Sequence, residues 1–111
     1  MKDMDPDLFD FLTTYMDSFI KWDLLRFFHE NPHTIDTAEN IARYAGRTVA
    51  DVQVGLQSLA QQGLLEEIIV DKMVVYMLKP DPALRTRLEQ FIEATRDREF
   101  RRKVIYHMVR H

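Results

Sequence analysis

The sequence of 111 residues predicts a mainly α-helical α+β protein with one β-hairpin placed among its helices. Apolar residues recur at helical spacing over most of the chain. Between residues 65 and 78 the pattern changes to two short runs of β-branched and large apolar residues, which is typical of strands. Helical spacing then resumes after Pro82. A chain of this length fits one domain, so residues 1–111 are predicted to fold as a unit.

The first part of the chain predicts two helices. Asp5 and Pro6 favour a helix start, because Asp caps a helix and Pro is preset for its first turn. This N-terminal helix is assigned to residues 1–18. A second helical pattern, Phe19–Glu30, either continues the first helix or restarts near Asp17 and Ser18. It ends at Asn31, since the residue before a proline is disfavoured in a helix.

Two helices joined by a tight turn follow. Residues 36–39 have the spacing of a capping box, which predicts a short helix that ends at Gly46. Thr48 and Asp51 repeat a similar spacing with Asp in place of Glu. They predict the start of a longer helix over residues 48–62, which stops at Gly63.

The change of period predicts a β-hairpin. Its strands are Leu65–Val70 and Met73–Leu78, and its turn is Asp71-Lys72. From Pro82 onward, a C-terminal helical extension is predicted over residues 81–111. The charged stretch from Arg96 to Lys103 is either a solvated middle of one helix or a break between two helices.

Composition narrows the class of protein. The chain is 46% hydrophobic and 30% charged, as in ordinary globular proteins. It has no cysteine, which fits a reducing compartment and excludes a disulfide scaffold. Its longest unbroken apolar run, Met73–Leu78, is far shorter than the roughly 20 residues of a membrane helix. The N-terminus has no apolar signal segment. A cytoplasmic protein without a membrane partner is expected.

The order of elements resembles a known family. Over residues 19–80 the chain is similar to winged helix-turn-helix domains. The resemblance rests on TAENIARYAG (37–46), VQVGLQSLAQQGLL (52–65) and VYML (75–78), which match the first helix and turn, the second helix with its exit, and the returning strand of the wing. The flanking helices look like the dimerisation helices of small bacterial regulators of the ArsR and MarR type.

This resemblance implies a transcriptional regulator that binds double-stranded DNA in a sequence-specific way. In such domains the second helix of the motif enters the major groove and the wing contacts the backbone or minor groove. Gln53 and Gln57 are suited to adenine edges, because an amide both donates and accepts. Carried over by position, the DNA-binding candidates are Arg47, Thr48, Gln53, Gln57, Ser58 and Lys72.

A second function remains open. No Arg or Lys lies between Thr48 and Gln62, and Asp51 would lie near phosphates and repel them. The net charge is −3, whereas proteins that bind polyanions usually carry a basic patch. These features favour a winged-helix adaptor that binds another protein and no DNA.

Aromatic residues predict a homodimer. Seven of the twelve aromatic residues lie between Phe9 and Phe28, spread around the predicted helix axis. A second buried face supplied by a symmetry mate would cover them, and a twofold dimer would read a palindromic site. The predicted interface residues are Phe9, Phe11, Tyr15, Phe91, Ile105 and Val109. Ordinary core packing and a ligand pocket near the last helix are the alternatives.

Catalytic and metal-binding motifs have little support. His107 and His111 are four residues apart, but a zinc site needs three or four ligands and no cysteine is available. Surface histidines explain these positions, so no metal or cofactor is expected. No nucleophile elbow, phosphate-binding loop or metalloprotease motif is found, so no enzyme is expected. The basic cluster 96–103 is predicted to be solvated or to pair with acidic residues of a partner subunit.

Overall fold

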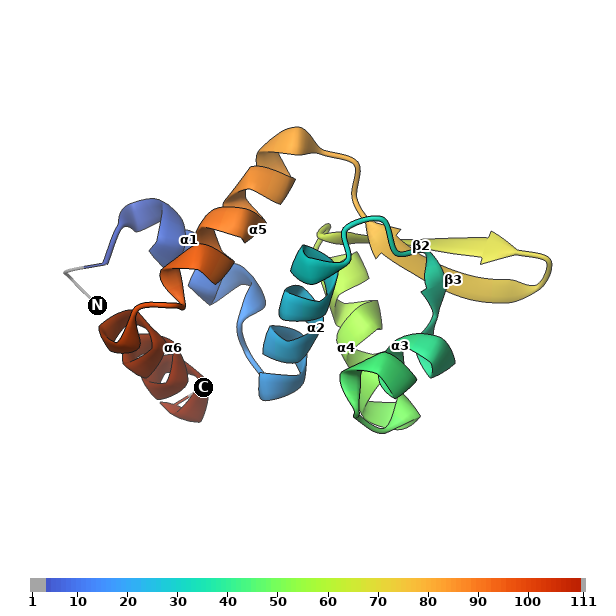
Figure 1. Ribbon diagram of the computed structural model, residues 1–111, viewed down its shortest axis with the longest axis horizontal. Helices are drawn as coiled ribbons and strands as arrows, with labels where there is room; N and C mark the ends of the chain where they lie inside the picture. Colours follow the sequence, from blue (N-terminus) through green and yellow to red (C-terminus); the bar gives the residue numbers. More distant parts are fainter. Residues whose placement is uncertain (1–3, 111) are drawn as a thin grey trace.

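The computed structural model describes residues 4–110, which form six helices and one three-stranded antiparallel sheet (Figure 1). The elements in chain order are α1 (Pro6–Tyr15), α2 (Phe19–Glu30), β1 (Asp36–Thr37), α3 (Ala38–Ala45), α4 (Val49–Gln61), β2 (Leu65–Val70), β3 (Met73–Leu78), α5 (Pro82–Ala94) and α6 (Arg98–Arg110). This mainly helical α+β architecture is compatible with a winged-helix-like fold.

Local caps define the first two helices. Asp5 caps α1, where its carboxylate accepts hydrogen bonds from the backbone N–H groups of Asp7 and Leu8. The helix ends at Tyr15, and Ser18 caps α2 by accepting from the N–H of Lys21. The chain therefore restarts a helix at residue 19, which settles the two alternatives left by the sequence.

The turn between α3 and α4 follows the sequence prediction with one correction. Thr37, and not Asp36, caps α3, because its hydroxyl accepts from the N–H of Asn40. Gly46 ends α3 in the left-handed region with φ +68°, which glycine adopts without a steric penalty. Thr48 caps α4 and accepts from the N–H of Asp51 at 3.2 Å.

The sheet contains one strand more than the predicted two. The β2–β3 hairpin, called the wing below, pairs Leu65 with Leu78 at its base and Val70 with Met73 at its tip. Asp71 and Lys72 both have positive φ angles of 48° and 68°, as in the type I′ turn whose twist suits a hairpin. The additional strand, β1, pairs with β3 on its other side, which gives the order β1-β3-β2.

The C-terminal extension consists of two helices. Thr95 ends α5, and the Asp97 carboxylate accepts from the N–H of Phe100 at 2.9 Å, which starts α6. Arg101 donates to the carbonyl oxygens of Thr95 and Arg96 and so ties the start of α6 to the break. The basic stretch 96–103 therefore contains a break and the first turns of a new helix.

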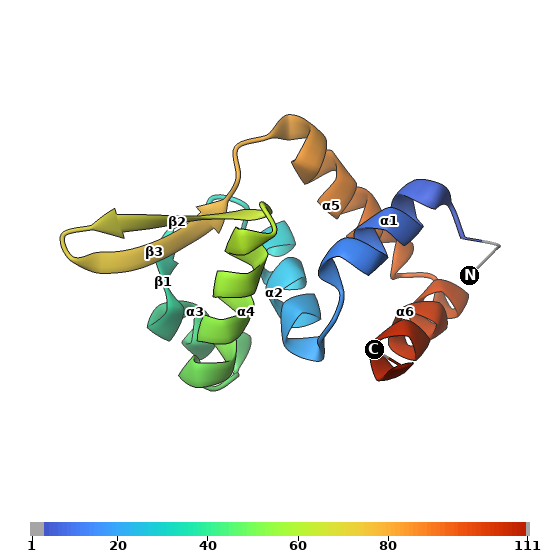
Figure 2. The ribbon, with the colours of Figure 1, turned by 180° about the vertical axis from the view of Figure 1, so that it is seen from behind.

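The core runs through the molecule from α1 to the sheet. Helices α2 and α4 lie side by side in the middle, with the wing on one side and α1, α5 and α6 on the other (Figures 1 and 2). Gly55 permits the close approach of α4 to α2, because an added Cβ would lie 2.8 Å from Cδ1 of Leu24. The exposed side of α4 is thus set by the face it buries against α2.

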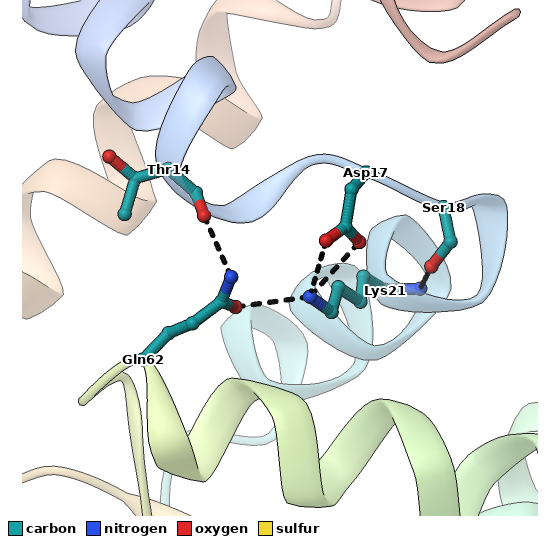
Figure 3. Close-up of polar contacts among 5 residues, drawn as sticks. All are labelled: Thr14, Asp17, Ser18, Lys21 and Gln62. Carbon is teal, nitrogen blue, oxygen red and sulfur yellow. Dashed lines mark hydrogen bonds and ion pairs between the residues drawn. The ribbon is translucent and has the colours of Figure 1, made fainter. Parts of the chain in front are cut away.

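A buried lysine connects the α1–α2 turn to the end of α4 (Figure 3). Lys21 is 3% exposed, and its ammonium donates to Asp17 Oδ2 at 3.0 Å and Gln62 Oε1 at 3.1 Å. Gln62 in turn donates from Nε2 to the carbonyl oxygen of Thr14 at 2.9 Å. This network joins three separate parts of the chain around the C-terminal end of α4.

Candidate nucleic-acid interface

The N-terminal end of α4 lies exposed beside the α3–α4 turn. Thr48 is exposed, and although its oxygen caps the helix, its hydroxyl hydrogen remains available to donate. Arg47 is also exposed, but its Nε donates to Asp23 Oδ2 of α2 at 2.7 Å. The same carboxylate also pairs with Arg26, so one negative charge is shared by two arginines, and Arg47 keeps only part of the attraction for a phosphate that a lone arginine has. The sequence did not predict this ion pair.

The two predicted reading glutamines lie together and share a contact with the wing. Gln53 is half-buried and Gln57 is exposed. Gln53 donates from Nε2 to the hydroxyl of Tyr76 at 3.5 Å, and the side chain of Gln57 lies beside that hydroxyl. Tyr76 itself donates to Glu67 Oε2 at 2.8 Å. Sequence reasoning missed both Tyr76 and Glu67 as neighbours of the site.

The other two candidates lie at different places. Ser58 is half-buried on α4, one residue after Gln57. Lys72 is exposed at the tip of the wing, which projects beyond α3 and α4 (Figure 1). The structure therefore gathers the glutamines and Ser58 on one helix, with Arg47 at its start and Lys72 on a separate projection.

Carboxylates surround the face that the predicted site occupies. A groove of about 590 Å³ runs between α4 and the edge strand β2. It is lined by Gln57, Ala60, Gln61, Leu65, Glu66 and Glu67. Asp51 is exposed on α4, and Asp71 lies beside Lys72 at the wing tip. This face thus carries few positively charged side chains. Any binding of DNA there depends on base contacts more than on phosphate contacts.

Apolar side chains are exposed on α3, on α4 and on the wing. On the helices they are Tyr44, Val49 and Val54, and on the wing they are Ile69, Val70, Met73 and Val74. The wing residues adjoin one another, since Ile69 pairs with Val74 and Val70 with Met73, and an exposed apolar patch is a common mark of a protein interface. The exposure of the wing tip was not predicted from the sequence.

The predicted dimer interface needs a correction. Phe11, Tyr15 and Phe91 are buried within the single chain, with exposures of 1%, 5% and 0%. Phe91 stacks on Phe11, and Phe11 packs against Tyr15. These three rings fill the core between α1 and α5 and offer no surface to a partner. Phe9, Ile105 and Val109 are exposed and remain candidates, with Val109 71% exposed.

Neither a metal centre nor a membrane span is found in the part of the chain that the structure describes. Within residues 4–110 no three His, Cys, Asp or Glu side chains are grouped to hold a metal ion. His111, which the sequence paired with His107, lies outside the described residues. Among residues 4–110 no helix is both long and apolar enough to cross a bilayer.

Tyr76 gives the site a pH dependence. Burial, and next the hydrogen bond to Glu67, raise its pKa from 10.0 to about 12. The folded protein therefore holds the Tyr76 proton more tightly than the unfolded chain does. The contribution of this proton to the free energy of unfolding is complete below pH 10 and is lost as the pH rises towards 12. We expect the free energy of unfolding, measured with urea across that interval, to fall more steeply in the wild type than in Tyr76→Phe. Tyr15, whose pKa burial also raises, contributes equally to both. Equal slopes would contradict the assignment.

Comparison with known proteins supports the fold. No protein-family model matches the chain, and no curated protein matches it. Among solved structures, it is similar to a protein described as a possible transcriptional regulator from Methanosarcina mazei Go1. The TM-score is 0.54 at 13% sequence identity, and the match covers 77% of this chain and 75% of that one. At this identity the likeness shows a shared fold and nothing more.

Proposed function

We propose that this protein is a cytoplasmic transcriptional regulator that binds double-stranded DNA by placing the exposed face of α4 in the major groove. The observation that carries the proposal is the position of α4. It follows a tight turn, is capped at its exposed end, presents Gln57 outward and is flanked by the wing. A helix in this setting fits the width of the major groove. The likeness to a possible regulator supports the same class of function.

Each candidate residue has a role in this proposal. The amides of Gln53 and Gln57 read bases, since an amide pairs with the donor and acceptor edge of adenine. The hydroxyls of Thr48 and Ser58 donate to phosphates or bases, and Arg47 and Lys72 contact phosphates. With two cationic contacts per chain, the logarithm of affinity should fall with the logarithm of salt with a slope of about −2 per chain. The role is binding, without catalysis.

The test measures fluorescence anisotropy of the protein with genomic DNA fragments and with a random duplex at two salt concentrations. Gln57→Ala is expected to weaken binding to preferred fragments about 5- to 100-fold and binding to the random duplex little, because it removes a base contact. Arg47→Ala is expected to weaken both and to lower the salt slope by about 1. Gln90→Ala, an exposed amide on α5, is the matched control and should change nothing. Absence of binding at low salt would overturn the proposal.

We further propose that the regulator is a homodimer whose second copy covers the exposed apolar residues of the terminal helices. Ile105 and Val109 lie one turn apart on α6 and are 41% and 71% exposed. A twofold dimer would present two α4 helices to a palindromic site. Light scattering after size exclusion should give a dimer for the wild type and a monomer for Val109→Glu. Gln90→Glu adds the same charge elsewhere and should remain dimeric. A monomeric wild type would overturn the dimer.

A protein-binding adaptor is the second candidate function, and the composition of the α4 face favours it. The carboxylates Glu66 and Glu67 line a groove against α4, and Val54 of α4 is an exposed apolar residue. Val54→Lys separates the two functions. A new cation on α4 should strengthen nonspecific DNA binding if the face meets DNA. If neither the wild type nor Val54→Lys binds DNA at low salt, the adaptor function is favoured.

A further inference from the structure

Tyr76 connects the two elements that the proposed function uses. Its side chain is fully buried on β3, opposite Glu67 of β2. Its hydroxyl contacts Glu67 Oε2 at 2.8 Å, Gln53 Nε2 at 3.5 Å and the side chain of Gln57. One oxygen atom thus holds side chains from α4 and from the edge strand of the wing.

The hydrogen bonds of this hydroxyl are made to side chains of the wing and of α4. A phenol has one hydrogen to donate and two lone pairs that accept. The hydrogen is donated to the carboxylate of Glu67, and a lone pair accepts from the amide of Gln53. Because Tyr76 is fully buried, it cannot itself read a base. Its effect on a ligand must pass through the glutamines.

The effect on the glutamines is to restrict them before DNA arrives. A flexible side chain loses rotamer freedom when it binds, and that loss weakens the complex. Gln53 and Gln57 lie one turn apart on α4. The amide of Gln53 donates to the Tyr76 oxygen, and the side chain of Gln57 lies beside it. Each amide keeps its carbonyl oxygen and a second N–H, which match the N6 donor and N7 acceptor of adenine.

We propose that Tyr76 is a positioning residue for base reading, which presets the amides of Gln53 and Gln57 so that they recognise adenine in the major groove. The inference rests on the DNA-binding function proposed above and names the base that this site prefers. It also gives the wing a role in specificity, since Glu67 of β2 completes the contact that holds Tyr76.

The experiment first selects preferred duplexes from a random library with the wild type. Affinity is then measured for a selected duplex, for the same duplex with its adenine pairs replaced, and for a random duplex. Tyr76→Phe is expected to lose about tenfold of the preference for adenine, which is the size of one good base contact. Its affinity for the random duplex and its salt slope should stay unchanged. Tyr106→Phe, which removes an exposed hydroxyl on α6, should keep the preference.

Two further readouts separate positioning from a merely structural role. In a Gln53→Ala and Gln57→Ala background, Tyr76→Phe should cause no additional loss of preference. In the wild type, NMR relaxation should show the side-chain amides of Gln53 and Gln57 to be more ordered than that of Gln61, which is exposed on the same helix. This second measurement needs no variant to fold.

Several results would overturn the inference. One is an unchanged adenine preference in Tyr76→Phe, and another is equal loss on selected and random duplexes. Equal mobility of the three glutamine amides would overturn it as well. DNA binding by the wild type without adenine preference would overturn this inference and leave the proposed function standing. No DNA binding by the wild type would overturn both.

Discussion

Replacing Phe91 with alanine is expected to lower the free energy of unfolding by about 3–5 kcal/mol. The ring is fully buried, stacks on Phe11 with centroids 4.8 Å apart and meets Phe100 edge-on at 5.7 Å. It therefore joins α1, α5 and α6, and its removal leaves a cavity among three helices. Urea unfolding followed by circular dichroism measures the loss.

Val54→Ala is the matched control for this experiment. Val54 is 66% exposed on α4 and lies outside the proposed dimer interface, so its truncation should change the free energy of unfolding by less than about 0.5 kcal/mol. The comparison also tests the corrected interface. If Phe91 served a dimer contact, its replacement would dissociate the dimer and leave the stability of the chain nearly intact, and that result would contradict the core assignment.

Helix and hairpin boundaries were predictable because their signals are local. Gly46 ends one helix and Thr48 begins the next, each through bonds to residues a few positions away. The structure confirms both predictions. The hairpin strands also lie where the change of period placed them. Strand β1 was not predictable. It has two residues, and its pairing with β3 joins positions about 40 residues apart, as in Asp36 with Tyr76.

The aromatic residues show where sequence patterns stop being informative. Periodicity indicates that a helix face is buried but not which element covers it. Phe11 and Phe91 are 80 positions apart in the chain, and their stacking follows from the packing of α5 against α1, for which no local signal exists. The excess of aromatics was therefore assigned to a second copy, although α5 of the same chain covers two of those residues.

In the candidate site too, local features were predictable and long-range contacts were not. The outward position of Gln57 follows from the helical period of α4, and the sequence predicted it. The partners of the site residues could not be predicted from the sequence. Asp23 reaches Arg47 across 24 positions, and Tyr76 reaches Gln53 across 23. Such contacts depend on how α2 and the wing pack against α4, and they decide how much charge and how much freedom the predicted residues retain.

Asp17→Ala is expected to destabilise the protein by about 1–3 kcal/mol, more than Lys21→Met does. The side chain of Lys21 is 4% exposed, whereas that of Asp17 is 39% exposed. Removing the carboxylate leaves a buried ammonium that keeps its hydrogen bond to Gln62 Oε1 (Figure 3). Methionine instead removes the charge and keeps the apolar stem among its neighbours. The partial exposure of Asp17 places the loss below that of a fully buried ion pair.

The control for this asymmetry is Glu93→Ala, which breaks the exposed pair of Glu93 with Arg96 and should cost less than about 0.5 kcal/mol. The double variant Asp17→Ala with Lys21→Met should be close to Lys21→Met alone, because the cost of losing Asp17 comes from the charge left behind. Chemical unfolding of all four variants measures these differences. If Asp17→Ala costs no more than Glu93→Ala, the buried lysine does not hold the end of α4 to the α1–α2 turn, and the orientation of α4 rests on its packing against α2, α3 and β2.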